Sequence, residues 1–145
     1  MKSRIQRSMV LVISVTLVIL YAILAVILYN RNLNILENEI RQEARYIQRA
    51  IDIAGTQYLE EMDSVDWSAR VTCITPDGEV LYDSGRNGED LENHSQREEV
   101  REALATGSGE DVRMSDTVGH EMYYYALLLD DGSVLRVARE MDGLV

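Results

Sequence analysis

The sequence has 145 residues, a single Cys, and 14 Lys+Arg against 25 Asp+Glu, which gives a formal net charge of −11. At this length we expect at most one soluble domain, and the acidity argues against a nucleic-acid partner, because phosphate recognition needs a basic surface. A single Cys excludes a disulfide within the monomer and a zinc site built on several thiolates.

Residues 9–29 form an uncharged, mainly aliphatic run. As a helix this run would be roughly 31 Å long, about the thickness of the hydrocarbon core of a bilayer. A cleaved signal peptide is the alternative, but its apolar region is shorter, about 7–15 residues, and small residues follow it. Here the run ends in Ile27-Leu28-Tyr29-Asn30-Arg31, a poor cleavage site. We therefore predict an uncleaved transmembrane helix over 9–29.

The charges around this span predict its orientation. Lys2, Arg4 and Arg7 precede it, and no acid does. The positive-inside rule therefore places residues 1–8 in the cytoplasm and residues 32–145 outside the cell membrane. The first 31 residues carry a charge of +4 and the remainder −15, so the exported part is strongly acidic.

Residues 32–63 are predicted to form a juxtamembrane stalk helix that continues from the span. Apolar residues recur at steps of three and four and make one stripe: Leu33, Leu36, Ile40, Ala44, Ile47, Ile51, Ala54, Tyr58 and Met62. No Pro interrupts the pattern, and Gly55 is its only weak point. The stripe could pack on the following domain or against a second copy of the chain. In both cases a helix continuous with the span can transmit a push or a rotation, which a flexible linker cannot.

Residues 64–140 are predicted to form one α+β domain. Two strands, Arg70–Thr75 and Glu79–Asp83, are joined by the turn sequence Thr-Pro-Asp-Gly. A short helix follows at Gln96–Ala105. It has Ser95 as a candidate N-cap, Glu98 to complete a capping box, and Gly107 as its stop.

Three more strands are predicted at Glu110–Asp116, Glu121–Leu129 and Ser133–Arg139. The second of them is apolar on both faces, so we place it at the centre of the sheet. The predicted fold class is α+β: a transmembrane helix continuing into a long amphipathic helix, then a five-stranded antiparallel sheet with a short helix, and with the helices on one face.

Four segments resemble PDC/Cache-type extracytoplasmic sensors in content and order, namely 70–84, 92–107, 123–126 and 131–139. The nearest relatives by this resemblance are membrane sensor histidine kinases of Gram-positive bacteria, of the phosphate-response and cell-wall-sensing type. The resemblance implies a PAS/Cache-like sensor domain over 64–140 and the start of a second transmembrane segment at 141–145.

The same resemblance implies the partners and the chemistry. We expect a homodimer in the membrane that responds to an unknown small ligand or partner protein. The chain has neither a phosphoacceptor-His context nor a Gly-rich ATP lid. It therefore looks like the input part of an ATP-dependent protein-histidine kinase. No cofactor is expected in this chain; ATP and Mg²⁺ would serve the missing kinase core, which would pass phosphate to a response regulator.

The candidate ligand-binding residues are a histidine, three arginines and three tyrosines: Tyr82, His94, Arg97, Arg113, Tyr123, Tyr125 and Arg136. A guanidinium fork suits a small anion, but in a domain this acidic the expected role of these arginines, and of Arg139, is pairing with Asp or Glu. The tyrosines could line a pocket between sheet and helix or fill the core in place of the absent Phe. His94 could contact a ligand, sense pH, or bond the loop backbone.

An acidic cluster surrounds the short helix: Glu89, Asp90, Glu92, Glu98, Glu99 and Glu102. It could attract a hard cation or a cationic peptide, but a solvated acidic face is the expected role.

Two other functions remain as alternatives to a signal-input module. One is a stand-alone single-pass membrane scaffold that acts through the amphipathic helix. The other is an anchored hydrolase, which the sequence does not favour because it has no Ser/His/Asp or Cys/His set, P-loop or paired-His metal spacing.

Overall fold

The computed structural model describes residues 2–61, 69–85, 92–115 and 119–141. The chain divides into two compact units, residues 1–35 with 144–145, and residues 36–143. The first helix, α1 (Lys2–Ala54), begins in the first unit. Among the described residues, one helix is long and apolar enough to cross a membrane, and it contains the predicted span. Within that span the Thr16 hydroxyl donates to the Val12 carbonyl at 2.8 Å, which satisfies a polar group that lipid could not.

The stalk part of α1 ends earlier than the sequence predicts. Gly55 adopts a left-handed φ of +78°, and its N–H donates to the Ile51 carbonyl at 2.7 Å, which closes the last helical turn. A separate short helix follows, α2 (Gln57–Glu61). The prediction of one helix over 32–63 is therefore wrong at Gly55, and its last two residues lie outside the described part.

The apolar stripe on the stalk is confirmed over most of its length. Its buried members are Leu36, Ile40, Ala44, Ile47 and Ile51, whereas Ala54 is exposed. All five belong to the same unit as the sheet. The stripe is thus covered within this unit of residues 36–143, which we call the sheet unit.

Five strands form one antiparallel sheet, and this confirms the predicted α+β fold. They are β1 (Arg70–Ile74), β2 (Val80–Asp83), β3 (Ser108–Met114), β4 (Glu121–Leu128) and β5 (Val134–Glu140). Their order across the sheet is β2-β1-β5-β4-β3, so β5 is the middle strand. The prediction that the strand at 121–129 is central is wrong. It failed because β5 buries a charged residue, Arg136, and so has a less apolar pattern than its position requires.

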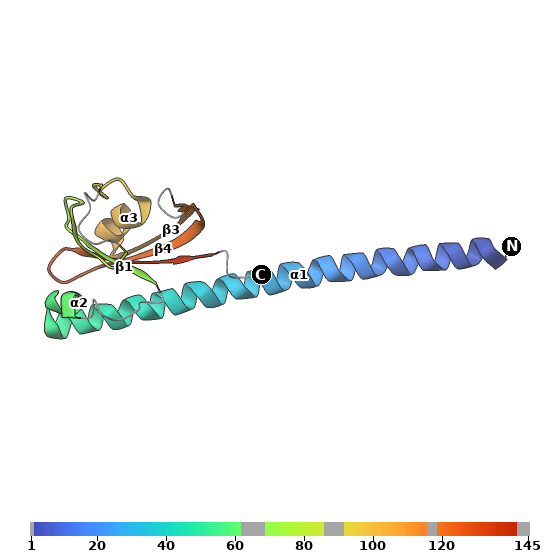
Figure 1. Cartoon of the computed structure of the whole chain (residues 1–145), viewed down its shortest axis with the longest axis horizontal. Coiled ribbons are helices and arrows are strands. Elements are labelled where there is room, and N and C mark those ends of the chain that lie inside the picture. The colour runs from blue at the N-terminus through green and yellow to red at the C-terminus, as the bar shows by residue number, and fades with distance from the viewer. Residues whose placement is uncertain (1, 62–68, 86–91, 116–118, 142–145) are drawn as a thin grey trace. The chain divides into compact units, whose positions relative to one another are not determined.

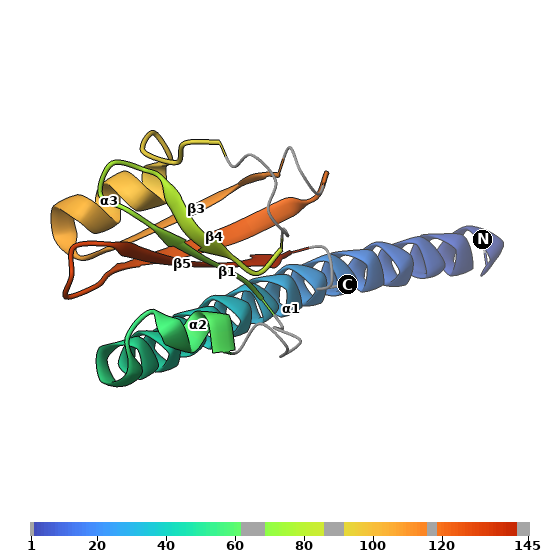
Figure 2. The ribbon, with the colours of Figure 1, turned by 60° about the vertical axis from the view of Figure 1, so that its left-hand side comes forward.

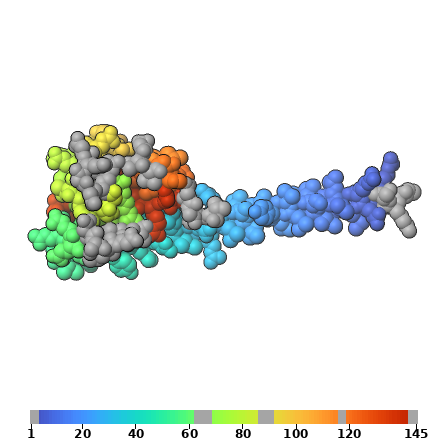
Figure 3. All heavy atoms as spheres, viewed as in Figure 1, coloured from blue at the N-terminus to red at the C-terminus, as the bar shows by residue number. Residues whose placement is uncertain are grey.

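Helices cover both faces of the sheet, whereas the sequence predicts them on one face only. The short helix α3 (Glu98–Thr106) packs with Val100 and Ala103 on one face, against a core of Ile74, Ala126 and Val134. The stalk residues 36–54 and α2 lie along the opposite face (Figures 1 and 2). The strand, α3 and stalk atoms of this unit form one closely packed mass (Figure 3). Alternate residues of each strand therefore face different helices. We call the two sides the α3 face and the stalk face.

Helix α3 begins at a different N-cap residue from the one predicted, whereas it ends where the sequence predicts. The N-cap residue is Arg97, which makes no capping side-chain hydrogen bond, so the predicted cap at Ser95 is wrong. Instead, the Ser95 N–H donates to Asn93 Oδ1 at 2.9 Å in the turn before the helix. The helix ends as predicted, where the Gly107 N–H donates to the Ala103 carbonyl at 2.8 Å.

Candidate functional site

The α3 face carries a row of buried or half-buried charges of alternating sign. Strand register places them there: Asp83 and Arg136 both lie opposite Thr72, and Asp111 lies opposite Tyr124. Helix α3, which covers this face, contributes one carboxylate, that of Glu99. We call the whole row the charge ladder, and it consists of Arg70, Asp83, Arg136, Glu99, Arg113 and Asp111.

Glu99 is the centre of the charge ladder. Its side chain has no exposed surface, and Arg113 holds both of its oxygens, through Nη1 at 2.6 Å and Nη2 at 2.9 Å. Arg136 Nη1 lies 3.3 Å from Oε1. Burial alone would raise the pKa of Glu99, but the hydrogen bond from Arg113 and the charges of both arginines hold that pKa below its usual value. Glu99 is therefore a buried carboxylate shared by two guanidinium groups.

Arg136 comes from the middle strand and is 4% exposed. Its Nη2 lies 3.4 Å from Thr72 Oγ1, and its Nε has no hydrogen-bond partner among the described residues. Burial lowers its pKa, and Glu99 opposes this effect. The guanidinium carbons of Arg113 and Arg136 lie over the Tyr124 ring, 3.9 Å and 5.3 Å from its centroid. The Tyr124 ring thus makes cation–π contacts with both guanidinium groups.

The other end of the charge ladder is a two-pronged pair between neighbouring strands. Arg70 donates through Nε to Asp83 Oδ1 at 2.8 Å and through Nη2 to Oδ2 at 2.7 Å. The Gly85 N–H also donates to Oδ1 at 2.9 Å. Burial would raise the pKa of Asp83, but these hydrogen bonds lower it overall. The carboxylate therefore stays ionised well below neutral pH.

His94 lies beside this cluster, in the turn before α3, and is 8% exposed. Its backbone N–H donates to the Gly78 carbonyl at 2.8 Å, whereas its side-chain Nδ1 has no partner among the described residues. Burial, followed by the positive charges of Arg136 and Arg97, lowers the pKa of His94 to about 4. The imidazole is therefore neutral at pH 7.

The predicted site residues fall on two faces of the sheet. His94, Arg113 and Arg136 lie at the α3 face, and Arg97 sits at the start of α3, 3.5 Å from Glu92. By register and strand alternation, the three predicted tyrosines face the stalk instead: Tyr82, Tyr123 and Tyr125. The seven residues therefore cannot form one site.

On the stalk face, two of these tyrosines take part in a separate cluster. The Tyr123 hydroxyl donates to Glu110 Oε2 at 2.8 Å, and Arg41 Nη2 lies 2.6 Å from the same oxygen. The Arg41 guanidinium carbon is 5.9 Å from the centroid of the Tyr125 ring. Burial and the neighbouring Glu110 raise the pKa of Tyr123. This cluster joins the stalk to β3 and β4.

The sequence alone did not identify several residues at the α3 face, among them Tyr124, Thr72 and Asp83. Because side chains alternate along a strand, Tyr124 must face the opposite side from its two tyrosine neighbours. The sequence does not show which side that is, because β4 is apolar on both faces. Glu99 was expected in a solvated acidic face, and its burial shows that expectation to be wrong. The remaining described members of that acidic cluster are exposed: Glu92, Glu98 and Glu102. Glu89 and Asp90 lie outside the described residues.

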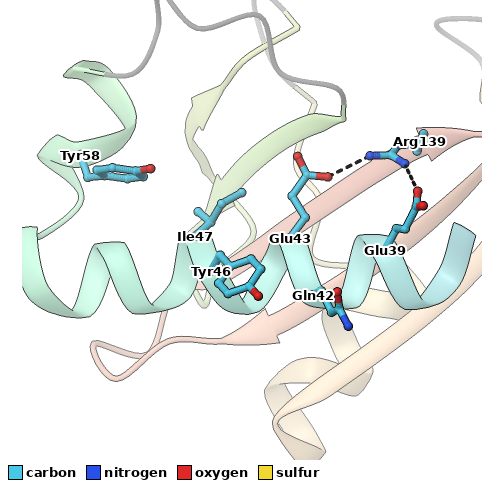
Figure 4. Close-up of a pocket in the computed structure, with 7 residues that line it drawn as sticks. All are labelled: Glu39, Gln42, Glu43, Tyr46, Ile47, Tyr58 and Arg139. Atoms are coloured by element: carbon cyan, nitrogen blue, oxygen red, sulfur yellow. Dashed lines mark hydrogen bonds and ion pairs between the residues drawn. The ribbon is translucent and has the colours of Figure 1, made fainter.

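A second candidate is a shallow open hollow of about 420 Å³ on the stalk side. Figure 4 shows Tyr58 of α2 at one end and Arg139 of β5 at the other, with α1 residues between them. Arg139 binds Glu39 Oε2 and Glu43 Oε2, each at 3.0 Å. Arg139 thus pairs with acidic residues, as expected, but its partners lie on the stalk, whereas Arg113 and Arg136 pair with Glu99 of the domain. In the described part of the chain, no group of three or more His, Cys, Asp or Glu could hold a metal ion.

Of the comparisons with known proteins, the one with family models identifies the family. The comparison with curated proteins gives no match. A family model described as Single Cache-like matches residues 30–135, which include the stalk, four of the strands in full and the start of β5. The match covers most of the chain and agrees with the long apolar helix, the five-stranded sheet and the short helix seen in the structure. The chain belongs to the single Cache-like family of sensor domains.

Proposed function

We propose that this chain is the signal-sensing and membrane-anchoring region of a two-component sensor histidine kinase, of the Gram-positive phosphate-response or cell-wall-sensing type. The observation that carries the proposal is the combination of a Cache sensor domain with α1, one helix that contains both the apolar span and the stalk. A continuous helix offers such a domain a direct route by which a stimulus would be transmitted across a membrane.

The stalk is tied to the sheet by polar contacts as well as by the buried stripe. Arg139 of β5 binds Glu39 and Glu43 of α1, and Gln48 Nε2 donates to the Leu128 carbonyl at 3.3 Å. Arg136, three residues before Arg139 on the same strand, belongs to the charge ladder on the other face. Strand β5 therefore connects the α3 face with the stalk. A ligand that binds one arrangement of these contacts better would shift the balance between arrangements.

The remaining parts of the proposal concern location and partners. Residues 1–8 lie in the cytoplasm and 32–145 outside the cell membrane, with 9–29 as the transmembrane helix and 141–145 at the start of a second. The chain works as a homodimer that responds to a small ligand or a partner protein. A kinase core, with ATP and Mg²⁺, passes the signal to a response regulator.

The orientation can be tested by labelling with a membrane-impermeant maleimide. The only native thiol, Cys73, is buried and is replaced by Ala in the background chain. In intact cells we expect Ser108→Cys to be labelled and Ser8→Cys to be protected, and both to be labelled after detergent lysis. Labelling of Ser8→Cys in intact cells would contradict the orientation.

The kinase connection is tested by the coding sequence beyond codon 145 and by the complete gene product. We expect an open frame with another span and a histidine-kinase core, and autophosphorylation from ATP and Mg²⁺ in vesicles. Arg139→Gln should change the autophosphorylation rate, whereas Arg101→Gln, a control on the exposed surface of α3, should not. A frame without a kinase core would reject the proposal in favour of a stand-alone scaffold. That alternative is weakened by the stalk stripe, which is already buried.

A further inference from the structure

Strand β3 forms one edge of the sheet, and half of its main-chain groups point outward. At the start of the strand the Leu128 N–H of β4 donates to the Gly107 carbonyl at 2.9 Å. At its end the Ser115 N–H donates to the His120 carbonyl, also at 2.9 Å. Bonding alternates along an antiparallel pair, so the odd-numbered residues of β3 bond to β4. The even-numbered residues from 108 to 114 therefore point their N–H and C=O groups away from the sheet.

Side chains of α3 cap the first part of this edge. The Thr106 hydroxyl donates to the Ser108 carbonyl at 2.8 Å, and the Glu110 N–H donates to Glu102 Oε2 at 3.2 Å. Within the described part of the chain, no group bonds the outward N–H and C=O of Val112. The edge is therefore capped at its start and open at Val112, and an open edge can pair with another strand.

The side chains beside the opening are apolar on one face and negative on the other. Val112 lies opposite Tyr123 and so is on the stalk face, as is Met114. The two side chains are 44% and 62% exposed. On the α3 side, Glu102 holds its carboxylate at the outward N–H of Glu110, and no cation pairs with it among the described residues. An added strand would thus cover two apolar side chains and meet an unmatched negative charge.

A second copy of the chain cannot fill this edge symmetrically in the same membrane. A symmetric parallel pair would set each outward residue beside its own copy, whereas parallel bonding needs an outward residue beside an inward one. An antiparallel pair has its two-fold axis perpendicular to the sheet. That axis reverses the direction of the stalk, which lies along the sheet (Figures 1 and 2). Chains anchored in one membrane in the same orientation have stalks that run the same way, so the edge is left to a different protein.

We infer that the outer edge of β3 at Val112 binds an extended segment of a partner protein, which adds one antiparallel strand to the sheet and alternates apolar with basic residues. Main-chain hydrogen bonds would hold the segment. Its apolar side chains would cover Val112 and Met114, and its basic side chains would lie on the α3 side near Glu102. The inference deepens the proposed function, because it states how a partner protein is recognised, and it rests on the proposed anchoring only where it excludes a second copy.

The test uses the full chain in detergent micelles and a labelled synthetic peptide of alternating Val and Lys, as long as β3. In an antiparallel pair, bonded residues have their side chains on the same face, so the Val residues of the peptide would bond to β3. We expect N-methylation of the Val residues to abolish binding, and N-methylation of the Lys residues to preserve it. The two methylated peptides have the same charge, so each controls for attraction to the acidic domain.

Val112→Pro removes the outward N–H and leaves the bonds to β4 in place, because proline is tolerated where an edge N–H faces solvent. This variant should bind the unmethylated peptide at least about tenfold more weakly, as expected for a lost hydrogen bond that leaves its partner unpaired. Val112→Thr keeps the N–H and the branched shape, and should bind as the wild type does. Protection of Cys73, the only thiol, from modification shows whether each variant is folded.

The charge of the segment has its own test. Glu102→Gln keeps the acceptor for the Glu110 N–H but removes the charge, and should weaken peptide binding about two- to fivefold at low salt. Glu98→Gln removes the same charge one helical turn away and should have no such effect. A peptide of alternating Val and Glu should bind more weakly than the Val–Lys peptide to the wild-type chain.

Three outcomes would overturn the inference. The first is equal binding of the two methylated peptides, which would show attraction by charge alone. The second is a folded Val112→Pro chain that binds the peptide as tightly as the wild type. The third is no binding of the Val–Lys peptide at millimolar concentration. None of these measurements involves orientation in the membrane or a kinase, so failure here and failure of the proposed function are separate results.

Discussion

Gly109 of β3 lies directly against α3, where the backbone oxygen of Glu99 occupies the space that a β carbon on Gly109 would need. The β carbon of Glu102 and the backbone nitrogen of Ala103 also lie within 3.0 Å of that position. A glycine on the strand therefore fixes how closely the helix approaches, and so fixes the depth at which the Glu99 carboxylate meets the arginines.

Gly109→Ala should push α3 away from the sheet and destabilise the sheet unit by about 1–3 kcal/mol, the usual cost of an overpacked contact. Urea unfolding, followed through Cys73 modification, measures the loss. Ser108→Ala, an exposed position next to it on the same strand, should change stability by less than about 0.5 kcal/mol. Equal effects of the two substitutions would contradict the close contact.

Glu99→Gln should cost far more than the same change at Glu98. It leaves Arg113 and Arg136 facing each other without the buried negative charge between them, a loss of about 3–5 kcal/mol. Glu98 pairs with Arg101 at an exposed surface, where such pairs contribute about 0–1 kcal/mol. The difference in free energy of unfolding between the two variants tests whether the charge ladder is a stabilising element of the fold.

Mild acid should destabilise the sheet unit through His94. Its pKa is about 4 when folded and 6.5 ordinarily, so between these values the unfolded chain binds a proton that the folded chain does not. The free energy of unfolding should therefore fall as the pH falls through this window, by about 2 kcal/mol from pH 7.5 to 5.0 for this residue alone.

His94→Gln removes that titration, so its stability should depend less on pH over the same interval. Urea unfolding at pH 7.5, 6.5 and 5.0 provides the comparison. If the wild type and His94→Gln lose stability in parallel, His94 is not the group responsible.

The homodimer proposal predicts which stalk positions form crosslinks. The buried stripe packs within the sheet unit, so a second copy can reach only the other side of the helix. Tyr46 and Ile53 are 74% and 86% exposed and are seven residues apart, on one side of the helix. In a Cys73→Ala background, cysteines on this side should form disulfides in membranes: Gln42, Tyr46, Arg49 and Ile53.

Cysteines in the buried stripe should not crosslink, and these positions serve as the controls: Ile40, Ile47 and Ile51. The measurement is the dimer fraction on a non-reducing gel after brief oxidation. A uniform dimer fraction along the stalk, or no dimer at any position, would contradict a parallel stalk dimer.

The fold could be predicted from the sequence because its signals are local. The apolar stripe, the Thr-Pro-Asp-Gly turn and the helix stop at Gly107 each depend on neighbouring residues, and all three are present. The break at Gly55 was visible as a weak point, but helix propensity alone did not show that the chain would adopt a left-handed φ there.

The candidate site was less predictable because it depends on pairing between distant strands. Arg136 and Glu99 are 37 residues apart, and nothing in either local pattern indicates that they meet. The three consecutive tyrosines in β4 could have been oriented in two ways, with either Tyr124 or its two neighbours on the α3 face. In the structure it is Tyr124 that lies at the charge ladder. In the sequence Glu99 resembles its exposed acidic neighbours. It differs from them in the structure because Arg113, from a distant strand, pairs with it beneath α3.

The middle strand of the sheet is also the last of the five along the chain. β1 pairs with β2, and β3 with β4, but only β5 joins these two hairpins. During synthesis both hairpins leave the ribosome before the strand that unites them, so the sheet cannot close until residue 140 has emerged. Until then β1 and β4 each present an unpaired edge that another chain could join. Whether the sheet closes on itself or pairs with another chain therefore depends on its final strand.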